Sequence, residues 1–153
     1  MKRFFSLLIL LLIPALSACS SAAVQPYETL LADNMLDSGA FSETLAPLDA
    51  DVLWTVYGLG DSGLKREALT DARSYRSTGA TCEEVSVLLF IDEASAQAAE
   101  KVLKDYLTGQ IASNRDYRPA ELPKLEKAVI RRRDHSLVML VAAHYDMAAD
   151  LLN

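Results

Sequence analysis

The stretch CEEVSVLLFIDEASAQAAEKVLKDYLTGQIAS (residues 82–113) decides the fold. Apolar residues alternate in its first part and the positions between them are apolar too, which is typical of a strand buried on both faces. Asp92 follows as a helix N-cap, and a helical pattern then continues to Ser113. The expected inner stripe of this helix consists of Ala94, Ala98, Val102, Tyr106 and Leu107. The stretch therefore predicts a central strand and a long helix, with Glu100 and Lys104 paired on the helix exterior.

Two hairpins and several shorter helices are expected around this unit. Strands are expected at 72–77 and 82–92 around a TGAT turn, and at 124–133 and 136–143 around Asp134-His135. Helical patterns lie at 27–36, 49–57, 62–71 and 144–153, and residues 114–122 resemble a loop fixed by Pro119. Asp49 and Gly58 are the expected N-cap and C-cap of the second helix. The pattern predicts an α+β fold of order α-α-β-β-α-β-β-α, with about four antiparallel strands in two hairpins and the long helix on one face.

The N-terminus is typical of an exported protein. Lys2 and Arg3 precede an apolar run that ends at Leu16, which is too short to span a membrane and suits a signal peptide. The following LSAC, ending at Cys19, resembles the lipobox of bacterial lipoproteins. That resemblance implies that the Cys19 thiol receives a diacylglyceryl group and that cleavage makes Cys19 the new N-terminus. Residues 1–18 are then a signal peptide, 19–26 a tether and 27–153 a single α+β domain, lipid-anchored outside the cytoplasm, on the outer leaflet in a Gram-positive cell.

The net charge of the chain limits the classes of partner that it is expected to bind. The chain contains 15 Lys and Arg residues and 21 Asp and Glu residues, which gives a formal net charge of -6. Removing residues 1–18 deletes two basic and no acidic residues, which leaves -8. Since nucleic-acid binders carry basic patches, no nucleic-acid partner is expected. The expected partners are the membrane, through the lipid on Cys19, and an envelope protein. Cys82 is expected to be a buried thiol whose pKa is raised by Glu83 and Glu84.

Gly58, Gly60 and Gly63 spell G-x-G-x-x-G, the pattern of a dinucleotide-binding turn. That motif requires a preceding strand and a second, parallel strand, whereas the run before Gly58 has a helical period and the next strands form a hairpin. Glu83 and Glu84 lie about 20 residues downstream, where such a motif places an acid, but a helix C-cap followed by a tight turn explains the glycines more simply. No cofactor is expected.

Catalytic and metal signatures are weak in this sequence. Cys82, His135 and His144 lack ligand-like spacing, and there is neither a G-x-S-x-G elbow nor an S-x-x-K motif. No catalytic or metal-binding residue is therefore predicted. The alternative is an envelope-acting hydrolase that uses Glu83 or Glu84 with His144, and it requires a pocket that holds these groups together.

The basic run Arg131-Arg132-Arg133 has two interpretations. In a strand its side chains alternate between faces, so the three cannot share one face. A charged edge strand that discourages edge-to-edge pairing is the first interpretation. The second is a contact to anionic wall polymer, lipid head groups or an acidic partner.

Three stretches resemble a family of small clostridial lipoproteins known as domain of unknown function 4358. They are LDADVLWTVYGL (48–59), YRSTGATCEEVSVLLFID (75–92) and YRPAELPKLEKAVI (117–130). Asp134-His135-Ser136 departs from the family, which usually has a glycine in that turn. The resemblance implies a lipoprotein with an α+β domain and no established activity. The candidate surface comprises Tyr75, Glu84, Tyr117 and Glu121, which resemble the family and could equally set the fold, together with Arg131 and Arg133. The sequence thus favours a membrane-anchored, non-catalytic binding or accessory module of the cell envelope.

Overall fold

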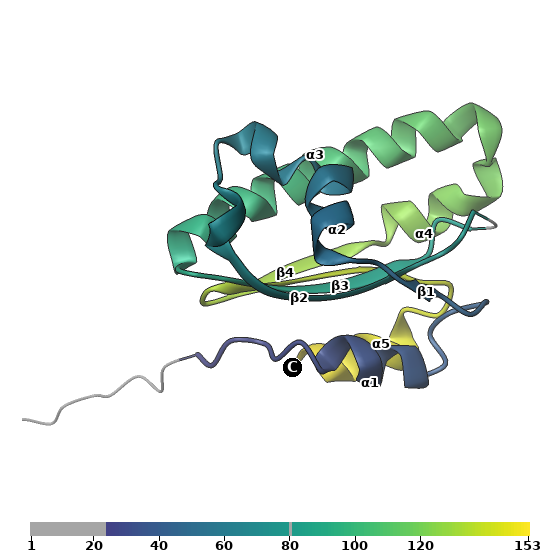
Figure 1. The fold of residues 1–153 in the computed structure, drawn as a ribbon. Helices are drawn as coiled ribbons and strands as arrows, with labels where there is room; N and C mark the ends of the chain where they lie inside the picture. The colour runs from purple at the N-terminus through teal and green to yellow at the C-terminus, as the bar shows by residue number, and fades with distance from the viewer. Residues whose placement is uncertain (1–23, 80) are drawn as a thin grey trace, which may run out of the picture.

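The computed structural model describes residues 24–79 and 81–153, so the expected signal peptide and Cys19 lie outside the described residues (Figure 1). The helices are α1 (Leu31–Asp37), α2 (Ala50–Tyr57), α3 (Glu93–Tyr117), α4 (Leu122–Glu126) and α5 (Asp146–Ala149). The strands are β1 (Ala46–Pro47), β2 (Leu69–Arg76), β3 (Glu84–Phe90), β4 (Val129–Arg133) and β5 (Ser136–Val141). Four short 3-10 helices are η1 (Leu59–Ser62), η2 (Arg66–Ala68), η3 (Pro119–Glu121) and η4 (Asp150–Leu152). Among the helices of this described part, none is long and apolar enough to cross a membrane.

The strands form one antiparallel sheet in the order β1-β2-β3-β5-β4. The predicted α+β class, the two hairpins and the central position of β3 are confirmed. β5 pairs with β3 from Glu84 opposite Val141 to Leu89 opposite Ser136, so it joins the two hairpins. The expected count of about four strands missed β1, which has only two residues and includes a proline, too short a run for a periodic signal.

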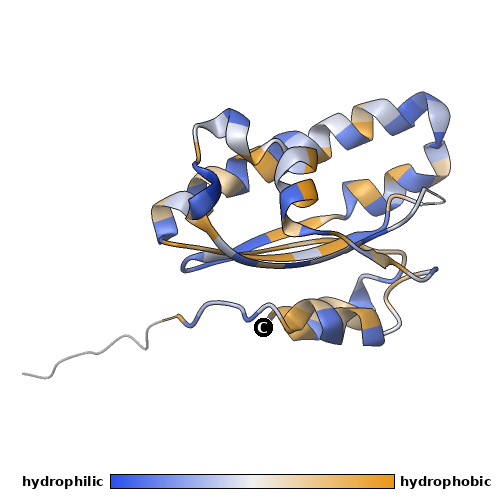
Figure 2. Cartoon of the chain, viewed as in Figure 1, coloured by the Kyte–Doolittle hydropathy of each residue, from blue (hydrophilic) through white to orange (hydrophobic). Residues whose placement is uncertain are grey.

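Helices cover both faces of the sheet. In Figure 1, α2, α3 and α4 lie on one face, while α1 and α5 lie on the other. Alternate residues of β3 divide between two cores: Leu88 and Phe90 pack under α3, while Val85 and Val87 pack with the α1 and α5 layer. Figure 2 shows hydrophobic segments on the strands and on helices of both layers. The expectation of a helix on one face was therefore correct for α3 and omitted the second layer.

The long helix α3 confirms its predicted start but not its predicted inner stripe. The Asp92 side chain accepts a hydrogen bond from the Ser95 amide at 2.7 Å, as expected of an N-cap. The buried residues of α3 are Ala96, Ala99, Leu103, Leu107 and Asn114, whereas Ala94 is exposed. Since Leu103 points inward, the buried stripe is rotated from the predicted one, of which Leu107 is the one buried member.

Three sequence predictions of local structure were wrong. The expected loop at 114–122 instead continues α3 to Tyr117 and then forms η3 and the start of α4. The expected helix at 62–71 is replaced by 3-10 turns and by β2, which begins at Leu69. The expected strand at 124–133 begins with α4, because Pro123 occupies the first turn of a helix, and becomes β4 only at Val129. The tight turn at Asp134-His135 is confirmed, with Asp134 at φ 51°.

The glycine interpretation at the end of α2 is confirmed. The Asp49 side chain caps α2, and Gly58 ends it in the left-handed conformation with φ 68°. A Cβ at Gly58 would lie 3.1 Å from Asp61 Oδ2. We therefore expect Gly58→Ala to lower the free energy of unfolding by about 1–2 kcal/mol in urea denaturation.

Gly109 provides the matched control for Gly58. It is an exposed position within α3, and a Cβ there would meet no atom within 4 Å. Gly109→Ala should raise the free energy of unfolding by about 0.5–1 kcal/mol, because alanine favours the helix. Equal effects at the two glycines would contradict the proposed role of Gly58.

Candidate functional site

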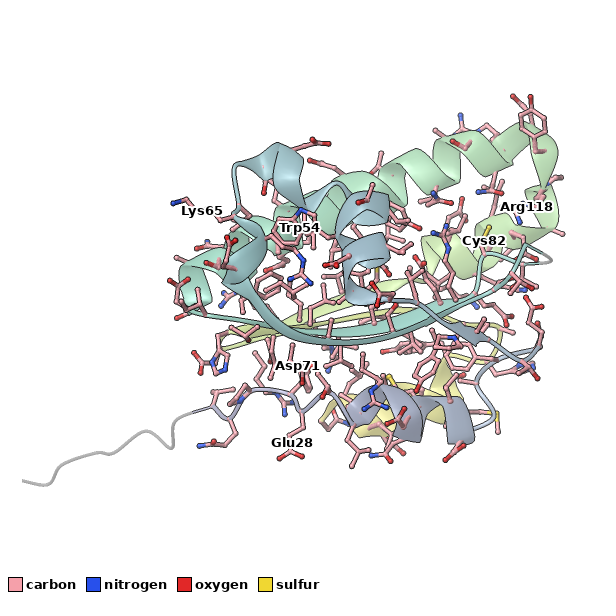
Figure 3. All side chains as sticks on the ribbon, in the orientation of Figure 1. Glu28, Trp54, Lys65, Asp71, Cys82 and Arg118 are labelled. Atoms are coloured by element: carbon pink, nitrogen blue, oxygen red, sulfur yellow. The ribbon has the colours of Figure 1, made fainter. Side chains whose placement is uncertain are left out.

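Buried carboxylates gather where β3 begins. Glu83, Glu84 and Glu121 have exposed fractions of 0%, 2% and 9%, although glutamate is almost never fully buried unless it is paired. Figure 3 labels Cys82 and Arg118 at this end of the sheet, near the C-terminal end of α3. Residues from the β2–β3 connection, α3 and α4 meet here, and this region is the candidate site.

Glu83 is held by three polar contacts. Its carboxylate accepts hydrogen bonds from the Ser42 amide at 2.9 Å and the Ser42 hydroxyl at 2.6 Å, and Lys124 Nζ lies 3.0 Å from Glu83 Oε1. The same ammonium lies 3.1 Å from Glu121. Partial burial opposes the charge of Lys124, but its hydrogen bonds to both carboxylates outweigh this and raise the pKa of Lys124. Lys124 is thus a charged lysine in a fixed position.

The β2–β3 connection is fastened to the segment after α3. Glu121 accepts a hydrogen bond from the Cys82 amide at 2.8 Å. Arg118 donates to the carbonyl oxygens of Gly79 at 3.2 Å and Thr81 at 3.3 Å. Half-buried Cys82 has a raised pKa, as predicted, but burial is the largest cause and the neighbouring carboxylates Glu121 and Glu84 add to it.

Glu84 belongs to a second network, on the α3 side of the sheet. Arg76 Nε lies 3.4 Å from its carboxylate and the Tyr106 hydroxyl donates to it at 3.4 Å. Burial raises the pKa of Glu84 to about 7, although Arg76 and Tyr106 oppose the shift. The ring of Tyr106 packs edge-on against Tyr57, whose centroid is 4.8 Å away. The Tyr57 hydroxyl in turn shares a 2.6 Å hydrogen bond with the buried Ser86 hydroxyl. Hydrogen-bonded polar groups therefore extend through this part of the core.

The six predicted surface residues do not form one site. Glu84 and Glu121 both lie near Cys82, but both are buried. Tyr75 packs in the other core and donates its hydroxyl to Asp33. Tyr117 is 88% exposed at the end of α3.

The two remaining surface residues lie on β4, Arg131 at mid-strand and Arg133 at the end of the sheet away from the buried carboxylates. Arg131 and Arg133 both donate to the Leu152 carbonyl oxygen, while Arg132 contacts Glu93 and Glu100 of α3. The arginines therefore alternate between faces, as predicted, and β4 is an edge strand of the sheet, as the first interpretation requires.

The groups of the hydrolase alternative lie in different surroundings. The contacts of Glu83 are with Ser42 and Lys124, and those of Glu84 are with Arg76 and Tyr106. His144 lines a hollow of about 480 Å³ together with Lys124, while neither glutamate lines it. Lys124, which contacts Glu83, is the residue that this hollow shares with the surroundings of the glutamates.

Sequence reasoning missed Lys124 as a site residue. Its partner Glu121 is three residues away, a spacing that brings side chains together on a helix. That signal was present, but the segment was assigned to a loop and a strand. The contact with Glu83, 41 residues away along the chain, has no local signature.

Comparisons with known proteins do not identify a family: no family model, no curated protein and no solved structure matches this chain. The resemblance to domain of unknown function 4358 stays a prediction. Within residues 24–79 and 81–153, no group of three or more His, Cys, Asp and Glu side chains could hold a metal ion.

Proposed function

We propose that the protein is a membrane-anchored extracytoplasmic lipoprotein that serves as a non-catalytic binding or accessory module of the cell envelope. The observation that carries the proposal is the sequence LSAC, ending at Cys19, behind a basic and then apolar leader. Two acyl chains on one cysteine provide stable membrane attachment, whereas a single chain provides only marginal binding.

The position of Tyr27 supports a short tether. Its amide donates to Ser136 Oγ at 2.7 Å and its hydroxyl to the Leu152 carbonyl at 3.2 Å. The guanidinium of Arg133 lies 4.3 Å from the centre of its ring. Since the chain is fixed at Tyr27, the eight residues of the tether reach no more than about 28 Å. The end of the domain that contains the β4–β5 turn would then lie close to the bilayer.

The internal pairing of the buried polar groups supports a binding or accessory role. In the described part of the chain, every buried side-chain nitrogen and oxygen has a hydrogen-bond partner. Glu83 in particular is occupied by Ser42 and Lys124. Carboxylates held in this way stabilise the fold, and a catalytic glutamate would have to break these contacts to reach a substrate.

Replacing the proposed lipidation residue tests the anchor. Cys19→Ala should move the protein from the membrane fraction to the soluble fraction and abolish the mass increase of the attached lipid, as measured by fractionation and intact mass. Cys82→Ala is the matched control, because it removes the other cysteine and should leave the protein on the membrane. A Cys19→Ala protein that stays on membranes like the wild type would refute the anchor.

The accessory role is tested by native co-purification of the lipidated protein from membranes. A single stoichiometric partner that is lost with Cys19→Ala is the expected result. Membrane-bound protein that purifies alone would argue against an envelope protein partner and leave ligand binding as the remaining form of the proposal.

A further inference from the structure

A hollow of about 480 Å³ lies between α4 and the segment that joins β5 to α5. Its polar lining includes Lys124, Lys127 and His144. Pro123 and Met147 contribute apolar lining. The protein carries an excess of acidic residues, yet two lysines line this one concave site.

The two lysines differ in how they are held. Lys124 directs its ammonium at Glu83 and Glu121, which use two of its three hydrogens. Lys127 lies three residues further along and is exposed, and it forms no salt bridge with any residue that the structure describes. The site therefore combines a lysine that is fixed in place with one that is free to close on a ligand.

His144 supplies a third polar group. The residue is exposed and lines the hollow, while its backbone amide is fixed by a 2.9 Å hydrogen bond to the Ala40 carbonyl. In either neutral tautomer the imidazole presents one N–H donor. A ring anchored through its backbone in this way can donate to a ligand in the hollow.

The acids near the hollow leave room for a negative ligand. Glu83 and Glu121 share the single positive charge of Lys124, but neither carboxylate lines the hollow. Asp146 also lines the hollow, but it is exposed, and water weakens the field of an exposed carboxylate.

We propose that this hollow binds a small oxyanion, a carboxylate or phosphate group, through Lys127 and His144, with the remaining N–H of Lys124 as a further donor. The apolar side of the ligand would pack against Pro123 and Met147. The inference rests on the binding role proposed above but not on the lipid anchor, and it gives that role a ligand class.

The test is an NMR titration of the full-length protein, purified as the cell produces it, with sodium phosphate and separately with sodium acetate up to about 50 mM at constant ionic strength. Binding should produce saturable shifts at residues 142–147 and at the His144 ring. The stronger of the two probes identifies the group that the site prefers. Absence of saturable shifts with both probes would overturn the proposal.

Variants show whether the shifts come from this hollow. Lys127→Gln should weaken binding about fivefold or more because it removes the positive charge, and His144→Leu should do so because it removes the ring N–H donor. Lys101→Gln is the matched control, an exposed lysine paired with Asp105 on α3, and should leave binding unchanged. Equal affinity in Lys127→Gln and Lys101→Gln would overturn the proposal. Because Cys19→Ala should not alter the titration, a failure of this site and a failure of the anchor are distinguishable.

Discussion

Lys124→Met should lower the free energy of unfolding by about 3–5 kcal/mol, because it leaves a fully buried carboxylate without its counter-charge. Glu83 is 0% exposed, and its remaining partner in the described chain is Ser42. Methionine fills a similar volume to the lysine stem, so the lost charge dominates the effect. Guanidinium denaturation at pH 7 measures the change.

Two further variants separate this charge effect from lost packing. The double variant Glu83→Gln with Lys124→Met should recover part of the loss, since the fully buried side chain at 83 is then uncharged and only Glu121 is left without its contact to Lys124. Lys104→Met removes an exposed lysine that pairs with Glu100 at 2.6 Å, and should cost no more than about 0.5 kcal/mol. A loss below about 1 kcal/mol in Lys124→Met would show that Glu83 does not depend on this ion pair.

Glu84 should make the domain less stable as the pH rises from about 4.5 to 8. Burial raises the pKa of Glu84 in the folded protein to about 7, against an ordinary value of 4.5. The folded state therefore holds a proton that the unfolded state releases. The stabilisation by this group is complete below pH 4.5 and is lost as the pH rises through 7. The gap between the two pKa values corresponds to about 3 kcal/mol.

Glu84→Gln isolates this contribution, because glutamine cannot ionise and can still accept a hydrogen bond from Tyr106. At pH 8 the variant should be more stable than the wild type by about 1–3 kcal/mol, and the difference should vanish or reverse near pH 4.5. Urea denaturation at several pH values measures it. Glu126→Gln, at an exposed position of α4, should retain the wild-type pH dependence. An unchanged slope in Glu84→Gln would assign the pH dependence to other groups.

The elements that the sequence predicted are those whose signals are local. β3 and α3 have unambiguous periods, and Asp49, Asp92 and Gly58 act on backbone groups within a few residues of themselves. β1 has no such signal, because its two residues form a strand only by pairing with Tyr75 and Arg76. The second helical layer was missed because a short amphipathic pattern does not say which face of a sheet it covers.

The candidate site was harder to predict than the fold. The acids at 83 and 84 were recognised as unusual, but their partners Ser42, Lys124 and Tyr106 come from three distant segments. A sequence shows that a carboxylate is present, whereas its burial and its partner depend on the tertiary fold. The hydrolase alternative, which pairs Glu83 or Glu84 with His144, likewise depends on a tertiary placement that no local pattern encodes.

The sheet order also constrains when the chain can fold. β5 is the last strand in the sequence, yet it lies between β3 and β4 and is buried along its whole length. Until Val141 has emerged, β3 has an open edge and β4 has no partner. Long-range pairing of this kind slows folding. The domain therefore cannot complete its sheet before residues 136–141 have been synthesised, and the export proposed above would act on a chain whose sheet is still incomplete.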